Sequence, residues 1–147
     1  MSSAKKISLE MVTPEKTALK AAADFVVLPA RQGELGVLPG HEPYFVELVE
    51  GEVRVTEGSE MKSFAIAGGF AEILKDRVSV FAETADLAEE IDAEAVRQEY
   101  ERSKAKTTAR DLDPLTLAAA EAATRLALAK LRVAELRGVR RRPAPRP

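Results

Sequence analysis

The sequence contains no cysteine, no tryptophan and a single histidine, His41, and aromatic residues make up only 5% of its 147 residues. Without cysteine the chain forms no disulfide, no cysteine-ligated zinc site, no iron–sulfur cluster and no catalytic thiol. One histidine excludes any site that needs two imidazoles. No apolar run approaches the ~18 residues of a membrane-spanning helix, and the first ten residues, MSSAKKISLE, lack the apolar core of a secretory signal. We therefore expect a soluble cytoplasmic protein.

Charge is distributed unevenly, although the formal net charge is only -2. Residues 1–90 carry 9 basic and 16 acidic side chains, a net charge of -7, whereas residues 91–147 carry 13 basic and 8 acidic ones, a net charge of +5. From Pro114 onward, 8 basic residues stand against Glu121 and Glu135, which gives +6. Two halves of opposite sign predict two units with different partners.

Short segments that alternate polar and apolar residues fill the first half, a pattern typical of half-buried strands. We predict about eight strands, at 6–11, 17–21, 25–28, 46–48, 53–55, 61–67, 70–74 and 78–81. Pro29 is expected to end the third strand. Glu50-Gly51 predicts a hairpin between its two flanking strands, and Lys75-Asp76-Arg77 predicts another. Such short strands must bury one face, so the sequence predicts an antiparallel β-sandwich or flattened barrel.

The second half predicts two helices. Asp92 is a suitable N-cap for a helix over 93–105, and residues 106–110 are expected to form a poor helix end or linker. Asp113-Pro114 combines an N-cap with proline at the first helical position, so a long helix is predicted over 115–137, with Gly138 as its stop. One apolar seam is Leu115, Ala119, Ala122, Leu126, Ala129, Val133 and Leu136, and a second is Leu117, Ala120, Thr124, Leu128 and Leu131. The helix is therefore expected to be apolar over a wide face, with Arg125, Lys130, Arg132 and Arg137 outside it. The last residues, VRRRPAPRP, are expected to be disordered.

No grouping of residues predicts catalysis or metal binding. The glycine-rich stretch 33–40 is not followed by a helix and lacks the Lys-Ser/Thr of a phosphate-binding loop. His41-Glu42 lacks the second histidine of an HExxH zinc site, and nothing places a serine beside His41. Glu89-Glu90 lies in a solvated acidic run. We expect no catalytic, cofactor-binding or metal-binding residue, and we interpret His41 as a residue that orders a loop or lies at an interface.

Several motifs, in order along the chain, resemble one family. Residues 33–43, GELGVLPGHEP, closely resemble the signature loop of the epsilon subunit of bacterial F-type ATP synthase. Residues 48–55, 67–73 and 80–85 are similar to the hairpin, the glycine pair and the exit from the sheet in that family, and 131–136 resemble the end of its last helix. The resemblance covers roughly residues 6–137, and its first motif is long and specific.

The resemblance implies a ten-strand β-sandwich over 1–86, a regulatory helical hairpin over 87–137 and, beyond the family pattern, a basic Pro-rich tail over 138–147. It implies a non-catalytic subunit of the central stalk. This subunit would dock on the gamma subunit and the c-subunit ring through the sandwich and couple proton-driven rotation to ATP synthesis. The implied location is the cytoplasmic face of the bacterial membrane, with membrane contact only through the complex.

The resemblance also implies roles for individual residues. By position, Glu34 and His41 fall in a loop that faces the c ring. Through its basic residues, Arg125, Lys130, Arg132 and Arg137, the last helix would meet acidic beta-subunit surface in the alpha/beta catalytic head and inhibit ATP hydrolysis. Some members bind ATP through an [IL]DxxRA motif, of which Leu112-Asp113 keeps only the first two residues. ATP binding by this chain is therefore doubtful, because the arginine that would contact phosphate is missing.

Two other functions remain as alternatives. The basic helix and tail would give salt-dependent, sequence-independent binding of nucleic acid, but the acidic strand domain and the scarcity of aromatic residues disfavour this alternative, and we expect no nucleic-acid partner. A small hydrolase built on the sandwich has no residue grouping in its favour.

Overall fold

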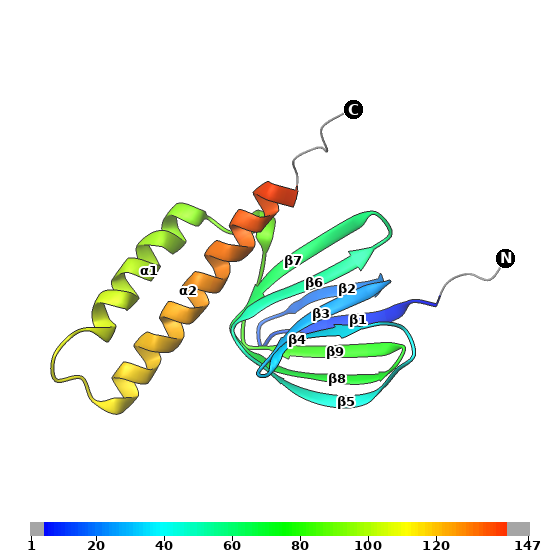
Figure 1. Ribbon diagram of the computed structural model, residues 1–147, viewed down its shortest axis with the longest axis horizontal. Helices are drawn as coiled ribbons and strands as arrows, with labels where there is room; N and C mark the ends of the chain where they lie inside the picture. Colours follow the sequence, from blue (N-terminus) through cyan, green and yellow to red (C-terminus); the bar gives the residue numbers. More distant parts are fainter. Residues whose placement is uncertain (1–4, 141–147) are drawn as a thin grey trace.

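The computed structural model describes residues 5–140, and for 137–140 it describes the backbone alone. Within this range ten strands precede two helices (Figure 1). The strands are β1 Ile7–Val12, β2 Thr17–Ala23, β3 Phe25–Ala30, β4 Gly33–Val37, β5 His41–Leu48, β6 Gly51–Glu57, β7 Glu60–Ile66, β8 Gly69–Lys75, β9 Arg77–Ala82 and β10 Ala85–Leu87. A short 3-10 helix, η1 Ala88–Glu90, leads into α1 Ala93–Thr107 and α2 Pro114–Arg140.

The strands form one sheet that folds over into two layers. Their order is β10-β7-β6-β3-β5-β8-β9-β1-β2, and β4 pairs with β3. Every pairing is antiparallel except that of β1 with β9. Because β2 also contacts β6, the sheet nearly closes into a barrel. This architecture confirms the prediction of an antiparallel β-sandwich of about ten strands followed by a helical hairpin.

Alternation along the strands builds the core between the two layers. β1 buries every second residue, and β8 and β9 bury alternate residues in the same way. The largest side chains of the sandwich core are almost fully buried: Ile7, Leu9, Met11, Leu28, Ile66 and Ile73. The period of two read from the sequence therefore identifies the inward face correctly.

The structure contains two strands that alternation did not predict. β4 lies in the glycine-rich stretch, and β10 lies in the acidic stretch after β9. β4 pairs with only one neighbour and exposes most of its residues, whereas β10 has three half-buried residues. Neither strand carries a clear buried face, so alternation gives no signal for them.

The predicted hairpin at Glu50-Gly51 is wrong. The flanking strands β5 and β6 do not pair with each other, because β3 lies between them in the sheet. The connection instead carries the chain from one layer to the other, and the Val49 N–H donates to the Pro29 carbonyl at 2.9 Å. A side chain at Gly51 would clash with the Pro29 ring, since an added Cβ would lie 2.7 Å from Pro29 Cβ.

The prediction that Pro29 ends its strand is also wrong, because β3 continues to Ala30. Pro29 is buried within β3 and faces Glu34 of β4. The Pro29 carbonyl points toward the β5–β6 connection. The nitrogen of a strand residue points to the same edge as its carbonyl, and on this edge the pairing of β3 with β6 ends at Val27. Proline is tolerated there because no ladder hydrogen bond requires its missing N–H.

Aspartate caps begin both helices, as predicted. The Asp92 carboxylate accepts hydrogen bonds from the Glu94 and Ala95 N–H groups, and Asp113 Oδ1 accepts one from Thr116 N–H at 2.8 Å. The predicted stop at Gly138 is wrong, because α2 continues through Arg140. A glycine costs only about 1 kcal/mol in a helix interior, which does not suffice to end this long helix. Residues 141–147 of the expected tail lie outside the described residues.

A second, smaller core joins the hairpin to the sandwich. It consists of Ala65, Ala88 and Val133, with Ile91 packed against it. α2 lies along β7 and β6 and also packs against α1 (Figure 1). No helix within residues 5–140 is long and apolar enough to cross a membrane.

Candidate docking surfaces

Three phenylalanines form a continuous row on the outer face of β5, β8 and β9. The rings of Phe45 and Phe70 have centroids 5.4 Å apart, and those of Phe70 and Phe81 lie 4.9 Å apart. Their exposed fractions are 64%, 42% and 40%, respectively. The row is a large apolar feature on a sandwich face that the helices leave open. Aromatic residues exposed in this way are typical of protein–protein contacts.

The row continues into a groove beside the β3–β4 hairpin. This groove has a volume of about 330 Å³ and is lined by hairpin residues together with Tyr44 and Phe45. Arg31 and Glu47 form an ion pair at its rim, with N···O 3.5 Å. The groove and the row together offer a partner an aromatic surface with concave and flat parts.

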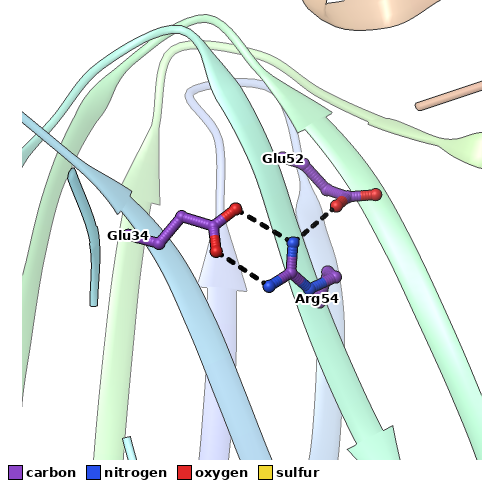
Figure 2. Close-up of polar contacts among 3 residues, drawn as sticks. All are labelled: Glu34, Glu52 and Arg54. Atoms are coloured by element: carbon purple, nitrogen blue, oxygen red, sulfur yellow. Dashed lines mark hydrogen bonds and ion pairs between the residues drawn. The ribbon is translucent and has the colours of Figure 1, made fainter. Parts of the chain in front are cut away.

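Glu34 in β4 forms an ion pair with Arg54 in β6, on the other side of β3. Its carboxylate accepts two hydrogen bonds from Arg54, both at 3.0 Å, and Glu52 accepts a third, also at 3.0 Å (Figure 2). This bidentate pairing joins β4 to β6 over the intervening β3. The hydrogen bonds to Glu34, and next those to Glu52, raise the pKa of Arg54 above its ordinary value. The guanidinium therefore remains charged throughout the physiological range.

Glu34 and His41 do not share a loop. Glu34 is in β4 beside the β3–β4 hairpin, whereas His41 is the first residue of β5 and pairs with Lys75 near the β8–β9 turn. The two residues therefore lie at opposite ends of the strands. The sequence suggested one loop because β4 was not recognised as a strand.

The segment before His41 is an ordered turn. The Gly40 N–H donates to Asp76 Oδ1 at 2.8 Å, and the His41 N–H donates to the Leu38 carbonyl at 3.2 Å. The His41 Nδ1 lies 2.6 Å from the Glu42 carbonyl oxygen. His41 is half-buried, and Leu38 beside it is 60% exposed. This end of the sandwich points away from the helices (Figure 1).

The basic residues of α2 divide between two environments. Arg125 Nε lies 3.5 Å from Glu50 Oε2, and Lys130 Nζ lies 3.6 Å from Asp86 Oδ2, so both cations pair with carboxylates of the sandwich. The Lys130 side chain is only 20% exposed, whereas that of Arg125 remains 57% exposed. Arg132 is exposed and lines a cleft of about 380 Å³ between α2 and the strands. The side chain of Arg137 lies outside the described residues. Arg125 and Arg132 are exposed, as expected for residues outside the packed face, whereas Lys130 is half-buried beside Asp86.

The apolar seam of α2 is buried only in part. Ala129 and Val133 are buried, as predicted, but Leu115 is 84% exposed at the start of the helix and Leu136 is 39% exposed. Ala120 of the second seam is also buried, as is Ala127, which lies outside both seams. Buried positions that are mostly alanine bring the helices close together but remove little apolar surface from water per residue. The hairpin therefore retains exposed leucines near both ends of α2.

Neither helix start completes the ATP-binding motif. Thr116 stands where the motif that begins at Leu112 requires arginine, and the Thr116 hydroxyl donates to Asp113 Oδ2 at 2.7 Å. A second pair with the first two residues of the motif, Ile91-Asp92, precedes α1, but Ala95 occupies its arginine position. Within the described part of the chain, no three His, Cys, Asp or Glu side chains are placed to hold a metal ion.

Sequence reasoning missed three parts of these surfaces: the phenylalanine row, Arg54 and the acidic partners Glu50 and Asp86. The row carries a usable signal, because Phe45, Phe70 and Phe81 alternate with buried neighbours and so must point outward. Glu50 and Asp86 carry no such signal, since only the docking of α2 brings them to its cations.

Comparison with known proteins identifies the family. Residues 6–88 match the family model described as ATP synthase, Delta/Epsilon chain, beta-sandwich domain. The ATP synthase epsilon chain of Syntrophobacter fumaroxidans is 45% identical over 135 residues, which cover 90% of this chain and 98% of that relative.

Solved structures agree with this match. A chain in the Euglena gracilis mitochondrial ATP synthase structure of OSCP, F1 and c-ring superposes with a TM-score of 0.76 at 26% identity, covering 92% of this chain and 84% of that one. A chain of the Tetrahymena thermophila mitochondrial ATP synthase central stalk and c-ring shares the fold, with a TM-score of 0.62 at 16% identity and coverage of 90% and 99%. This chain therefore belongs to the ATP synthase epsilon chain family.

Proposed function

We propose that this protein is the non-catalytic epsilon subunit of a bacterial ATP synthase rotor. In this role the sandwich docks on the gamma subunit and the c-subunit ring, and the helical hairpin regulates ATP hydrolysis. The boundary between these two domains is expected near residue 86. The phenylalanine row is the observation that carries the proposal. Three adjacent exposed rings contribute nothing to the stability of a subunit that stays free in solution, whereas a docked subunit buries them.

The gamma subunit is the partner assigned to the row. Burial of aromatic side chains contributes strongly to protein association, and a few such residues usually dominate the binding free energy. The groove beside Tyr44 and Phe45 extends this surface, so a protein partner would cover both features. Glu34 and His41 remain proposed contacts of the c ring, but they would have to meet it, or gamma, at different ends of the sandwich.

The hairpin is assigned the inhibitory role. Arg125, Lys130, Arg132 and Arg137 would approach acidic surface of the beta subunits, while Leu126, Val133 and Leu136 would fill the contact. Opposite charges would supply attraction and orientation more than raw affinity. As part of F1 the subunit would lie at the cytoplasmic face of the membrane and contact the membrane only through the complex.

Nucleic-acid binding is the weaker alternative. Two of the basic residues that would contact phosphate are paired with carboxylates of the same chain. The exposed phenylalanines, whose rings form the only aromatic pairs among the described residues, lie on strands that α2 does not cover. A binder of single strands would combine cations and aromatic rings in one groove.

Binding of gamma to full-length chains with altered rows tests the proposal. Phe70→Ser combined with Phe81→Ser should weaken the complex with gamma at least tenfold, because each ring is expected to contribute on the order of 1 kcal/mol or more. Met61→Ser provides a matched control, since Met61 is 42% exposed on β7, away from the row. Isothermal titration calorimetry measures both. Equal affinity of the row variant and the control would reject the assignment of gamma to this face.

A further inference from the structure

Two ion pairs cross the boundary between the hairpin and the sandwich. Arg125 reaches Glu50 in the β5–β6 connection, and Lys130 reaches Asp86 in β10. One member of each pair, Glu50 or Lys130, is only 20% exposed, whereas Arg125 is 57% and Asp86 is 42% exposed, so both pairs lie at the rim of the interface. Between them, Val133 is packed against Ala65 and Ala88. The sandwich thus presents two carboxylates, on different elements, to one face of α2.

These carboxylates offer α2 the same chemistry as the acidic partner assigned above. A guanidinium or ammonium group cannot serve two distant carboxylate surfaces at once. We infer that Glu50 and Asp86 form an internal docking site that competes with the catalytic head for Arg125 and Lys130. This inference rests on the proposed inhibitory role of the hairpin. It adds the sandwich residues that determine the fraction of molecules in which α2 is detached from the sandwich.

The geometry of the two pairs favours reversible docking. Their N···O separations of 3.5 and 3.6 Å exceed the ~2.7–2.9 Å of a strong charge-assisted hydrogen bond. The Arg54–Glu34 pair within the sandwich, by contrast, is bidentate at 3.0 Å. The apolar part of the interface is also small, with alanine at most of its buried positions. The hairpin is therefore held by contacts that are weak individually and add together.

A buried cysteine at position 133 would measure opening of this interface. The chain has no cysteine, so Val133→Cys introduces a single thiol at a site that is 1% exposed. Its rate of modification by a soluble thiol reagent follows the fraction of molecules in which α2 has left the sandwich. In this background, Glu50→Gln with Asp86→Asn should accelerate labelling on the order of three- to tenfold.

Two controls isolate the interface. Glu94→Gln removes a more exposed ion pair that lies wholly within α1, the contact of Arg97 with Glu94 at 2.8 Å, and should leave the labelling rate unchanged. Ala71→Cys, at a fully buried position of β8, reports unfolding of the sandwich and should label equally slowly with and without the Glu50 and Asp86 substitutions. Equal labelling of the thiol at position 133 in the double variant and its parent would overturn the inference.

Charge reversal separates internal docking from inhibition. Glu50→Lys combined with Arg125→Glu keeps an opposite pair at the interface and should restore slow labelling of the thiol, whereas Glu50→Lys alone should label fast. Failure of the combined variant to slow labelling would contradict a direct pairing.

In the reconstituted complex, Glu50→Gln with Asp86→Asn should lower ATP hydrolysis. Faster labelling without lower hydrolysis would support the internal site and reject the inhibitory role, so the two failures are distinguishable.

Discussion

At the scale of single residues, close approach of strands depends on particular glycines. Gly69 begins β8 with φ +143°, and a Cβ at this position would lie 1.9 Å from the Phe81 carbonyl oxygen. Gly69→Ala should therefore lower the free energy of unfolding by more than about 2 kcal/mol, since both the backbone conformation and the contact oppose a side chain. Chemical denaturation measures this change.

Gly58 provides the matched control for Gly69. It also has a positive φ, +60°, but nothing lies within 4 Å of an added Cβ. Gly58→Ala should cost only about 1 kcal/mol, the ordinary penalty of a left-handed residue. Similar losses for the two variants would show that the contact with Phe81 contributes little.

Asp24 makes stability sensitive to acid. Its carboxylate accepts hydrogen bonds from the Lys6 ammonium at 2.5 Å and from the Gly58 N–H at 2.6 Å, and these bonds, that of Lys6 first, hold the pKa of Asp24 below its ordinary value of 3.8. A lowered pKa in the folded state stabilises the protein above the unfolded pKa, and this stabilisation is lost as pH falls through the folded value.

Asp24→Asn should therefore lower the denaturation midpoint at pH 7, and its difference from the parent chain should shrink as pH falls below about 4. Denaturation series at several pH values check this outcome, with the exposed Glu15→Gln as a control. A difference that stays constant down to pH 2 would show that the charge of Asp24 does not contribute.

Residues whose role is local are the ones that sequence predicts best. Asp92 and Asp113 are correctly predicted as caps, because a cap depends on only three or four neighbouring residues. The pairing of Arg125 and Lys130 with the sandwich is missed, because helix periodicity places a residue on a face but does not say which surface that face meets. Glu50 and Asp86 receive no role for the same reason.

At the scale of elements, pairing is harder to predict than strand existence. The eight strands with a clear buried face are all present, although their observed ends differ by up to a few residues, most at the start of β5. The link between β5 and β6 has the composition of a hairpin turn, yet β3 separates the two strands. Local composition does not report a crossing between layers, because the competing partner lies twenty residues earlier in the chain.

The two helix starts lead to a prediction about nucleotide. Neither Leu112-Asp113 nor Ile91-Asp92 is followed by the arginine of the ATP-binding motif. Millimolar ATP should therefore leave the melting temperature of the isolated protein unchanged, because only a ligand that binds the native state raises it by mass action. A saturable rise in melting temperature would contradict this and would require other cations to hold the phosphates.

At the scale of the whole molecule, an acidic sandwich carries a more basic hairpin. The opposite charges of the two halves were visible in the sequence, and the structure shows where they meet, at Arg125–Glu50 and Lys130–Asp86. The resemblance to epsilon subunits implied ten strands where alternation gave eight, because a family pattern contains edge strands that single-sequence periodicity misses. Alternation can indicate that Phe45, Phe70 and Phe81 each point outward, but only the pairing of β5, β8 and β9 shows that they form one row.

Hydrolysis by the reconstituted enzyme tests the regulatory role most directly. The full-length chain is compared with a chain that ends at Asp111, which lacks α2 but retains the sandwich and its phenylalanine row. The truncated chain should bind equally and raise the rate of ATP hydrolysis, because it loses both the cations and the apolar seam of α2, while ATP synthesis should persist. Equal rates of hydrolysis with both chains demonstrably bound would contradict the account and leave the protein a purely structural part of the rotor.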